Sequence, residues 1–343
     1  ANFLINLKSP IKHIKFIPRR FTFAVSTTDG SIKLYNVMVA RNKNKRIIKY
    51  SNCSLVRQFK YESCFLYFDF IKFLGKDILI GITSTSKVIA IDVIKMEIEF
   101  ELQISLLLGF PTAFVVNEQE CWILVGTSKG YISFWDLRFS TLIKTWRIIE
   151  GNHDRKKFPI NQLILYQDGF CVIGGTGEPD ISVWSMKDFL CKYVLGSFVE
   201  NPRVKLYNLE EIDLNIDQQI MKFLHDEELG ESEDNNNEID NSMTFLVNSG
   251  KHLVSANRER NIIAWDMENA EKSVSFNPAY DTHFTKTQVS SGLSLLNERC
   301  NLDKKKSHIQ ERHRDIITGI CASAVPYEMI ISIDRNGYIH CNL

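Results

Sequence analysis

The sequence predicts an all-β protein, built from repeated antiparallel sheets arranged as the blades of a propeller. One observation is an internal repeat, in which an apolar run, a turn of small residues and a short alternating strand follow one another. Another is that each unit is rich in β-branched and aromatic residues and is bounded by Gly, Asn, Asp or Ser, as hairpins are. The repeat occurs at 21–36, 77–92, 121–136, 170–185, 252–266 and 329–343.

The spacing of these units indicates the kind of propeller. Aligned on Trp135, the equivalent positions are Tyr35, Ile91, Trp184, Trp265 and Cys341. The intervals on either side of Trp135 are at or near the 40 to 45 residues of WD repeats. Most units follow another candidate strand, such as 11–17 or 316–322, so each holds three or four strands. Because a lone sheet has two faces to bury, successive sheets are expected to stack and close radially. The prediction is one WD-repeat β-propeller domain over residues 1–343.

Three insertions, at about 38–50, 199–245 and 270–312, account for the longer intervals. The first is basic and is expected to be a polar loop. Residues 226–241 are acidic and Asn-rich, with few apolar anchors, so they are expected to be disordered. Helical spacing predicts an inserted amphipathic helix whose apolar face holds Leu209, Ile212, Ile216, Ile220 and Phe223. That face either packs on its own propeller or binds a protein partner.

Composition excludes several classes of protein. The 343 residues include 41 basic and 41 acidic side chains, unlike the basic balance of a nucleic-acid binder. The longest apolar run, at 104–116, is broken by polar residues, Gly and Pro and is too short for a spanning helix. The eight cysteines lack CxxC spacing, which favours reduced core residues of a cytosolic protein. The chain begins without Met and ends directly after a strand-like segment, so a fragment of a longer chain is expected.

Motifs that resemble catalytic or cofactor loops are better explained as turns. Gly126 and Gly130 would suit a phosphate loop only if a helix followed, and the alternating YISFWDL follows instead. GGTGEP at 174–179 fails the dinucleotide fingerprint for the same reason. The His313 triplet lacks the Asn that a kinase catalytic loop requires. We therefore predict no catalytic residue, cofactor or metal. Structural roles in the blades are predicted for Trp135, Asp136, Trp184, Trp265, His313 and Asp334.

Two stretches resemble one family beyond generic WD repeats. The first carries a Cys-Trp pair, Gly-Thr-Ser-x-Gly and Trp-Asp-hydrophobic-Arg-Phe, at Cys121, Trp122, Gly126, Thr127, Ser128, Gly130, Trp135, Asp136, Arg138 and Phe139. The second is HRDIITGI at 313–320, followed by IISIDRNGYI at 330–339. Both resemble the C-terminal WD-repeat domain of the regulatory, protein-kinase-like vacuolar protein sorting subunit of class III phosphatidylinositol 3-kinase.

The resemblance implies a non-catalytic scaffold, because the kinase-like domain of that family lies outside this region. Its partners would be a Beclin-type coiled-coil subunit, the associated subunit of that coiled coil, and the lipid kinase. Its place would be cytoplasmic, peripheral on endosomal, Golgi, autophagosomal or vacuolar membranes through the complex. The family has seven blades, so seven are favoured although six are visible; one was cut from the start or is too degenerate to recognise.

Other interpretations remain open from the residues alone. The runner-up function is a WD-repeat adaptor of another assembly, such as a coat or a ubiquitin-ligase scaffold. The basic runs at 41–49 and 304–314 are either solvated loops or contacts to anionic lipid. An enzyme with an active site at the propeller centre would need converging His and carboxylate side chains, which the turns do not supply.

Overall fold

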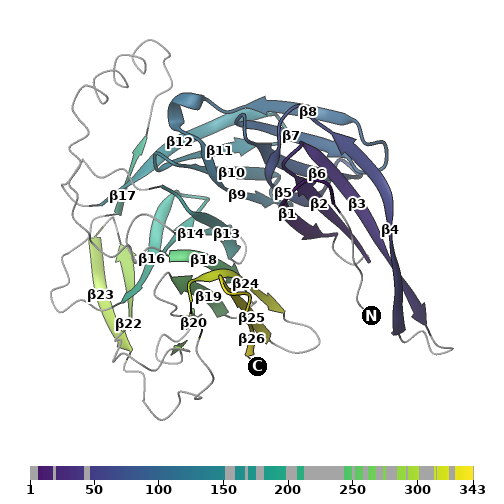
Figure 1. Cartoon of the computed structure of the whole chain (residues 1–343). Helices are drawn as coiled ribbons and strands as arrows, with labels where there is room; N and C mark the ends of the chain where they lie inside the picture. The colour runs from purple at the N-terminus through teal and green to yellow at the C-terminus, as the bar shows by residue number, and fades with distance from the viewer. Residues whose placement is uncertain are drawn as a thin grey trace.

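The computed structural model contains six antiparallel sheets, which we call blades 1 to 6 in chain order (Figure 1). It describes residues 7–17, 21–41, 47–150, 159–166, 169–174, 181–197, 207–211, 243–248, 252–257, 262–267, 273–275, 284–290, 293–300, 313, 315–323 and 329–342. All-β architecture of the propeller class is thereby confirmed. The described residues hold six of the expected seven blades.

Each blade begins with an inner strand and meanders outward. Blade 1 comprises β1 (Ile11–Phe16), β2 (Thr22–Thr27), β3 (Ser31–Arg41) and β4 (Ile47–Lys60); blade 2 comprises β5 (Phe65–Phe73), β6 (Lys76–Thr83), β7 (Lys87–Asp92) and β8 (Ile98–Gln103). Blade 3 comprises β9 (Pro111–Asn117), β10 (Trp122–Thr127), β11 (Tyr131–Asp136) and β12 (Thr141–Glu150); blade 4 comprises β13 (Gln162–Tyr166), β14 (Phe170–Gly174), β15 (Ile181–Ser185) and β16 (Leu190–Ser197). Blade 5 comprises β18 (Met243–Asn248), β19 (His252–Asn257), β20 (Ile262–Asp266) and β21 (Val274–Ser275); blade 6 comprises β24 (Ile317–Ser323), β25 (Met329–Asp334) and β26 (Ile339–Asn342).

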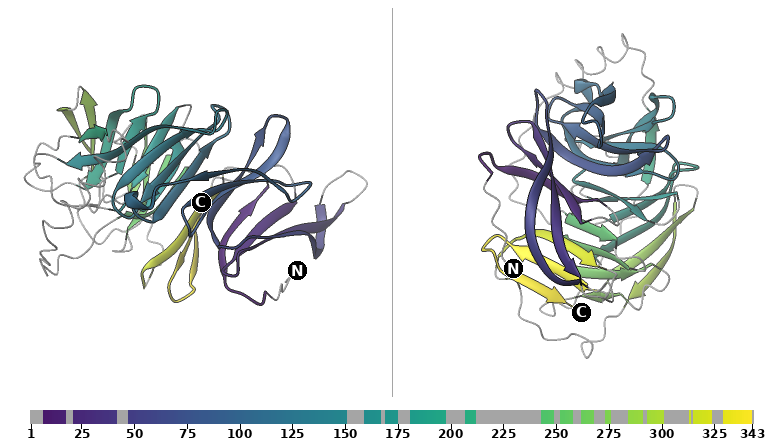
Figure 2. Two further views of the ribbon diagram at one scale, coloured as in Figure 1. Left: turned by 90° about the horizontal axis from the view of Figure 1, so that it is seen from above. Right: turned by 90° about the vertical axis from the view of Figure 1, so that its right-hand side faces the viewer.

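Neighbouring blades pack face to face in chain order. The inner strands β1, β5, β9, β13, β18 and β24 contact one another in sequence, and the blades follow a curved arc in all views (Figures 1 and 2). Five apolar clusters fill the five junctions between successive blades. The core of this protein is therefore a series of sheet-on-sheet layers.

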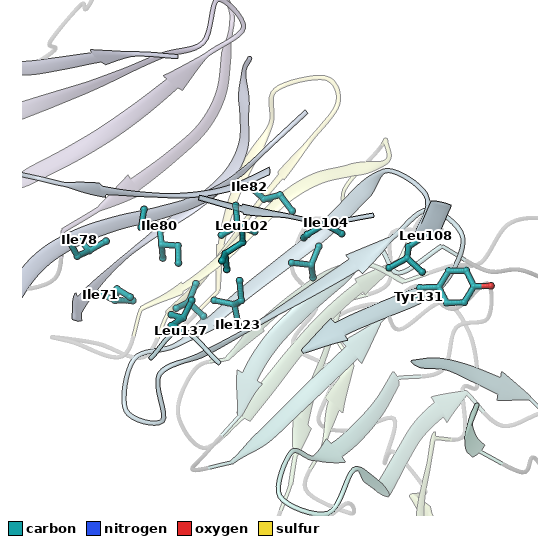
Figure 3. Close-up of a cluster of buried hydrophobic side chains, with 14 residues drawn as sticks. Ile71, Ile78, Ile80, Ile82, Leu102, Ile104, Leu108, Ile123, Tyr131 and Leu137 are labelled. Atoms are coloured by element: carbon teal, nitrogen blue, oxygen red, sulfur yellow. The ribbon is translucent and has the colours of Figure 1, made fainter. Parts of the chain in front are cut away.

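The junction of blades 2 and 3 shows why the strands are apolar along their whole length (Figure 3). On β6, Ile78, Ile80 and Ile82 face blade 3, where they meet Ile123 of β10. The intervening Leu79 faces blade 1. Because successive side chains of a strand point to opposite faces, a sheet covered on both sides needs an apolar residue at every position.

The turn between the second and third strands has the same geometry in blades 1, 2, 3 and 6. In each, the fourth turn residue donates its N–H to the carbonyl of the first, at 3.0 to 3.1 Å, and has a positive φ. Gly30, Gly130 and Gly337 occupy that position in three blades, and Ser86 with φ 59° occupies it in blade 2. Gly130 thus serves a hairpin turn, as the sequence predicts, because this left-handed conformation favours glycine.

The strand register corrects the alignment of the last unit. Trp135 lies opposite Ile123 and Trp265 lies opposite Leu253. When residue pairs are counted from the turn, each of these is the fourth pair. The same position in blade 6 is Asn342, opposite Ile330. The alignment with Cys341 was therefore wrong by one residue.

Two expectations about the insertions are also corrected. Residues 38–41 and 47–50 belong to β3 and β4, which pair as far as Arg41 and Ile47, so most of the expected polar loop is strand. Leu209 lies in β17 (Tyr207–Glu211), which pairs with β12, and not in a helix. The other helix positions, Ile212, Ile216, Ile220 and Phe223, and the acidic segment 226–241 lie outside the described residues.

Inserted strands extend the outer edges of two blades. β17 adds a fifth strand to blade 3, and β22 (Phe284–Ser290) pairs with β16 while β23 (Leu293–Cys300) pairs with β22, giving blade 4 six strands. Both edges therefore gain backbone hydrogen bonds from chain that is distant in sequence. The described strands of these insertions, at 207–211, 284–290 and 293–300, cover edge strands.

Gly126 provides a test of the packing between blades 3 and 4. A Cβ at this position would lie 2.5 Å from Ile160 Cγ2 and 2.7 Å from Ile160 Cβ. We expect Gly126→Ala to reduce the free energy of unfolding by about 1 to 3 kcal/mol through overpacking. Gly319→Ala is the matched control, because nothing lies within 4 Å of its added Cβ. Equal urea midpoints for the two variants would contradict the tight junction.

Candidate functional site

The predicted tryptophans occupy one repeated position near the end of the third strand. Trp184 and Trp265 are buried, whereas Trp135 is half-buried. Trp265 Nε1 donates to Ser255 Oγ at 2.8 Å. The Nε1 atoms of Trp135 and Trp184 have no partner among the described residues. Packing of the indole rings therefore contributes more than a shared hydrogen-bond set.

Asp136 organises the turn that follows Trp135. Its Oδ1 accepts the backbone N–H of Arg138 at 2.8 Å, and the guanidinium donates to both carboxylate oxygens, at 3.1 and 2.5 Å. Hydrogen bonding from Arg138 lowers the pKa of Asp136 below its usual value, despite the opposing effect of burial. The Arg138 guanidinium lies 5.6 Å from the centre of the Phe139 ring, which is exposed. The Trp-Asp-x-Arg-Phe run thus forms a rigid turn with an exposed aromatic tip.

A buried polar network ties blade 6 together. His313 Nδ1 lies 3.2 Å from Asp334 Oδ2, and His313 Nε2 lies 2.6 Å from Ser332 Oγ. All three side chains are buried. An ionised carboxylate only accepts hydrogen bonds, so Nδ1 carries the proton and Nε2 accepts from the serine hydroxyl. The sequence singled out His313 and Asp334, and the structure adds Ser332, which lies on β25 two residues before Asp334.

The charges in this network follow from burial. Burial lowers the pKa of His313, and the nearby His340 lowers it further, while Asp334 acts in the opposite direction. Burial raises the pKa of Asp334, but the Tyr338 N–H and His313 outweigh it, so its pKa lies below the usual value. His313 is therefore neutral and Asp334 ionised at neutral pH.

The described residues contain few of the groupings that chemistry at a reactive centre requires. No group of three His, Cys, Asp or Glu side chains that could hold a metal occurs in the described ranges. Burial raises the pKa of Cys191 to about 12 and also raises that of Cys171, so neither thiol is a ready nucleophile. The network around His313 is enclosed within one blade and fixes strand geometry.

Exposed apolar side chains form the feature that sequence reasoning missed. Leu106, Leu107 and Phe110 lie on the connection between β8 and β9 and are 60%, 41% and 68% exposed. We call these three residues the apolar knob. Leu106 and Leu107 lie in η1 (Leu106–Leu108), a single turn of 3-10 helix, and Phe110 follows two residues after its end. In the sequence these residues belong to an apolar run at 104–116. Hydrophobic periodicity in that run does not distinguish the side chains that are buried from those that are exposed.

The knob lies on the face that carries the inter-blade connections. Phe110 N–H donates to Ser128 Oγ and Ser128 N–H donates to the Phe110 carbonyl, which joins the knob to the β10–β11 turn. We call this side of the propeller the connection face. Phe139 and Leu74, 73% and 84% exposed, lie on turns at the other ends of the strands, and so on the opposite face.

No helix in the described part of the chain is long and apolar enough to cross a membrane.

Comparisons with known proteins relate the chain to one group of relatives. No family model matches the chain. It is 27% identical over 372 residues to the VPS15 serine/threonine-protein kinase of Komagataella pastoris, covering 98% of this chain and 26% of the relative. It is 24% identical over 352 residues to VPS15 of Saccharomyces cerevisiae, covering 96% and 22%, and 28% identical over 134 residues to vps15 of Schizosaccharomyces pombe, covering 39% and 8%. The chain spans about a quarter of the length of the first two relatives.

The His313 network predicts a loss of stability in mild acid. A group with a lowered folded pKa contributes stability that is present above its unfolded pKa and is lost as the pH falls. The stability contributed by His313 therefore begins to be lost as the pH falls below about 6.5, its ordinary pKa, and that contributed by Asp334 below about 3.8. We expect the free energy of unfolding, measured by urea titration, to fall less steeply between pH 7.5 and 5 in His313→Gln than in the unaltered chain.

Asp334→Asn provides the opposite test of the same network. Removing the carboxylate removes the one neighbour that raises the pKa of His313. The stability of this variant should therefore depend on pH more steeply over the same range. Identical slopes in all three proteins would show that His313 does not titrate with folding.

Proposed function

We propose that this chain is the WD-repeat region of a VPS15-type protein and that it is a non-catalytic interaction scaffold within a class III phosphatidylinositol 3-kinase complex. The observation that carries the proposal is similarity over almost the whole chain to proteins of that name, on a propeller fold. The relatives are named as protein kinases, and a kinase-like domain would belong to the remainder of the longer protein. Residues 1–343 would form one domain with a structural role.

The physical character of the propeller supports a role in binding. Its buried polar cluster holds a blade together, and the thiols of Cys171 and Cys191 are protected by burial. By contrast, large apolar side chains are exposed on short, hydrogen-bonded turns, at Phe110 and Phe139. Exposed apolar groups on a rigid framework are typical of surfaces that bind other proteins.

The partners we propose are a Beclin-type coiled-coil subunit, its associated subunit and the lipid kinase. In such a complex the region would support assembly for autophagy and endosome-to-vacuole protein sorting. It would be cytoplasmic and would reach endosomal, Golgi, autophagosomal or vacuolar membranes through the complex. We propose no nucleic acid, metal or cofactor as a ligand.

Removing this region from the full-length protein tests the scaffold role. We expect the truncated protein to lose the coiled-coil subunit in co-purification, because the propeller supplies its docking surface. Co-purification with full-length protein, at matched expression, is the control. Retention of every subunit by the truncated protein would instead favour an adaptor of another assembly.

The segment that contains Ile216 and Ile220 offers a narrower test. Its apolar positions recur at helical spacing, so we propose that it supplies one apolar face to a partner. Ile216→Asp with Ile220→Asp in the full-length protein should reduce capture of the coiled-coil subunit at least tenfold. Capture at the unaltered level, with an unchanged unfolding midpoint, would remove this segment from the interface.

A further inference from the structure

We propose that the outer end of the β3–β4 hairpin binds the surface of an anionic phospholipid membrane. We call this part of the hairpin the basic arm; it comprises residues 37–41 of β3 and 47–53 of β4. The inference goes beyond the proposed scaffold, which reaches membranes only through its partners, and it does not depend on that function. Residues 42–46, which join the two strands, lie outside the described residues.

The basic arm is a two-stranded ribbon that extends beyond the rest of blade 1. β2 pairs with β3 only as far as Thr22 opposite Asn36, whereas β3 pairs with β4 as far as Arg41 opposite Ile47. The two strands run on together past β1 and β2 (Figures 1 and 2). A ribbon of two strands is only marginally stable in water. Contact with a further surface would therefore stabilise the arm.

The charge of the whole hairpin has one sign. Between Asp29 and Glu62 the sequence holds eight basic residues and no acidic one, although the chain has 41 of each sign. The eight are Lys33, Arg41, Lys43, Lys45, Arg46, Lys49, Arg57 and Lys60. Five of them fall within 41–49, so the charge is densest at the end of the arm. Basic clusters of this kind are attracted to anionic headgroups.

The strand register places apolar residues together on one face of the arm. Alternate positions along a strand share a face. One face therefore holds the pairs Val37–Cys53, Val39–Tyr50 and Arg41–Ile47. The other holds the intervening pairs Met38–Asn52 and Ala40–Lys49. Aliphatic residues, a tyrosine and flanking basic residues are the composition of segments that lie at the boundary between headgroups and acyl chains.

The arm projects from the propeller on the side opposite the connection face. β4 ends at the connection to blade 2, where Tyr61 N–H donates to the Gly30 carbonyl of the β2–β3 turn at 3.0 Å. The basic arm is at the other end of the same two strands. The exposed side chains of Leu74 and Phe139 lie on turns at that opposite face too. A membrane is extended, so it can contact the arm and these separate turns at once.

The apolar residues favour a membrane over other anionic partners. Nucleic acids are held mainly through their phosphates, by basic side chains, and would leave Val37, Val39 and Ile47 uncovered. An acidic peptide would supply carboxylates but would need apolar residues of its own. A bilayer supplies both, with anionic headgroups for the basic residues and acyl chains beneath them for the apolar ones.

Photocrosslinking at position 50 tests the contact. We expect p-benzoylphenylalanine in place of Tyr50, in the full-length protein, to form lipid adducts on vesicles of phosphatidylcholine with phosphatidylserine. On phosphatidylcholine alone the adduct yield should be at least about tenfold lower, because the basic residues then lack anionic partners. The same residue in place of Leu106, which is exposed on the connection face, is the control and should form no lipid adduct. Absence of lipid adducts at position 50 would overturn the proposal, as would adducts with single-stranded RNA in a mixture of RNA and vesicles.

Charge reversal then tests whether the basic residues of the arm are responsible. In protein with the crosslinker at position 50, Arg41→Glu with Lys49→Glu should lower the yield of lipid adducts at least about tenfold. Arg57→Glu with Lys60→Glu is the matched control, since it makes the same change of charge at exposed positions of β4. Arg57 is about 25 Å along the strand from Lys49, well beyond the screening length in physiological salt, so the yield should be unchanged.

The remaining outcomes separate the arm from the general charge of the protein. Equal losses of adduct in the two charge variants would show that net charge and not the arm governs binding, and an unchanged yield in the arm variant would exclude its basic residues. Either result overturns the proposal. The urea midpoints of both variants should match that of the unaltered protein; should the arm variant unfold early, the comparison of the two vesicle compositions at position 50 decides.

Discussion

The need to cover both faces of every sheet governs this structure. In blade 2 alternate residues of β6 face blades 1 and 3, so neither face could meet water without exposing an isoleucine or a leucine. At the two ends of the arc, apolar side chains of the terminal blades are exposed. Phe16 on β1 is 63% exposed and Ile339 on β26 is 62% exposed, each on a blade with a neighbour on one side. A seventh blade stays a prediction, and these apolar ends are where it would pack.

Local patterns predicted the strands and turns because their causes are local. A turn whose fourth residue has a positive φ favours glycine at that position. A strand whose two faces are both covered requires a continuous apolar run. Both patterns can be recognised within a few consecutive residues. Strand pairing is not local. Leu209 pairs opposite Ile148 of β12, which is distant in sequence, and at Leu209 this pairing overrides the helical spacing. The equivalent of Trp135 in blade 6 is likewise identified by the strand register, which shows that it is Asn342 and not Cys341.

The candidate functional residues also differ in whether local sequence could identify them. His313 and Asp334 could be found in the sequence because they flank strands of one blade, and the repeat fixes where such residues meet. The distances from His313 to Asp334 and to Ser332, 3.2 and 2.6 Å, depend only on the geometry of that blade. The knob could not be found, because whether Leu107 or Leu108 is buried depends on how blades 2 and 3 approach each other. Burial in this connection is a property of the junction.

The separation of framework from surface explains how a propeller can acquire binding sites without losing stability. The turn between second and third strands keeps one geometry whether its fourth residue is Gly130 or Ser86, since backbone bonds define it. The inter-blade connections are less constrained: four residues join β4 to β5, and the longer link between β8 and β9 carries the knob. Because that link is hydrogen-bonded to turns at both ends, residues added between them can face solvent while the layers beneath remain packed. Exposed apolar residues there are therefore compatible with a stable blade.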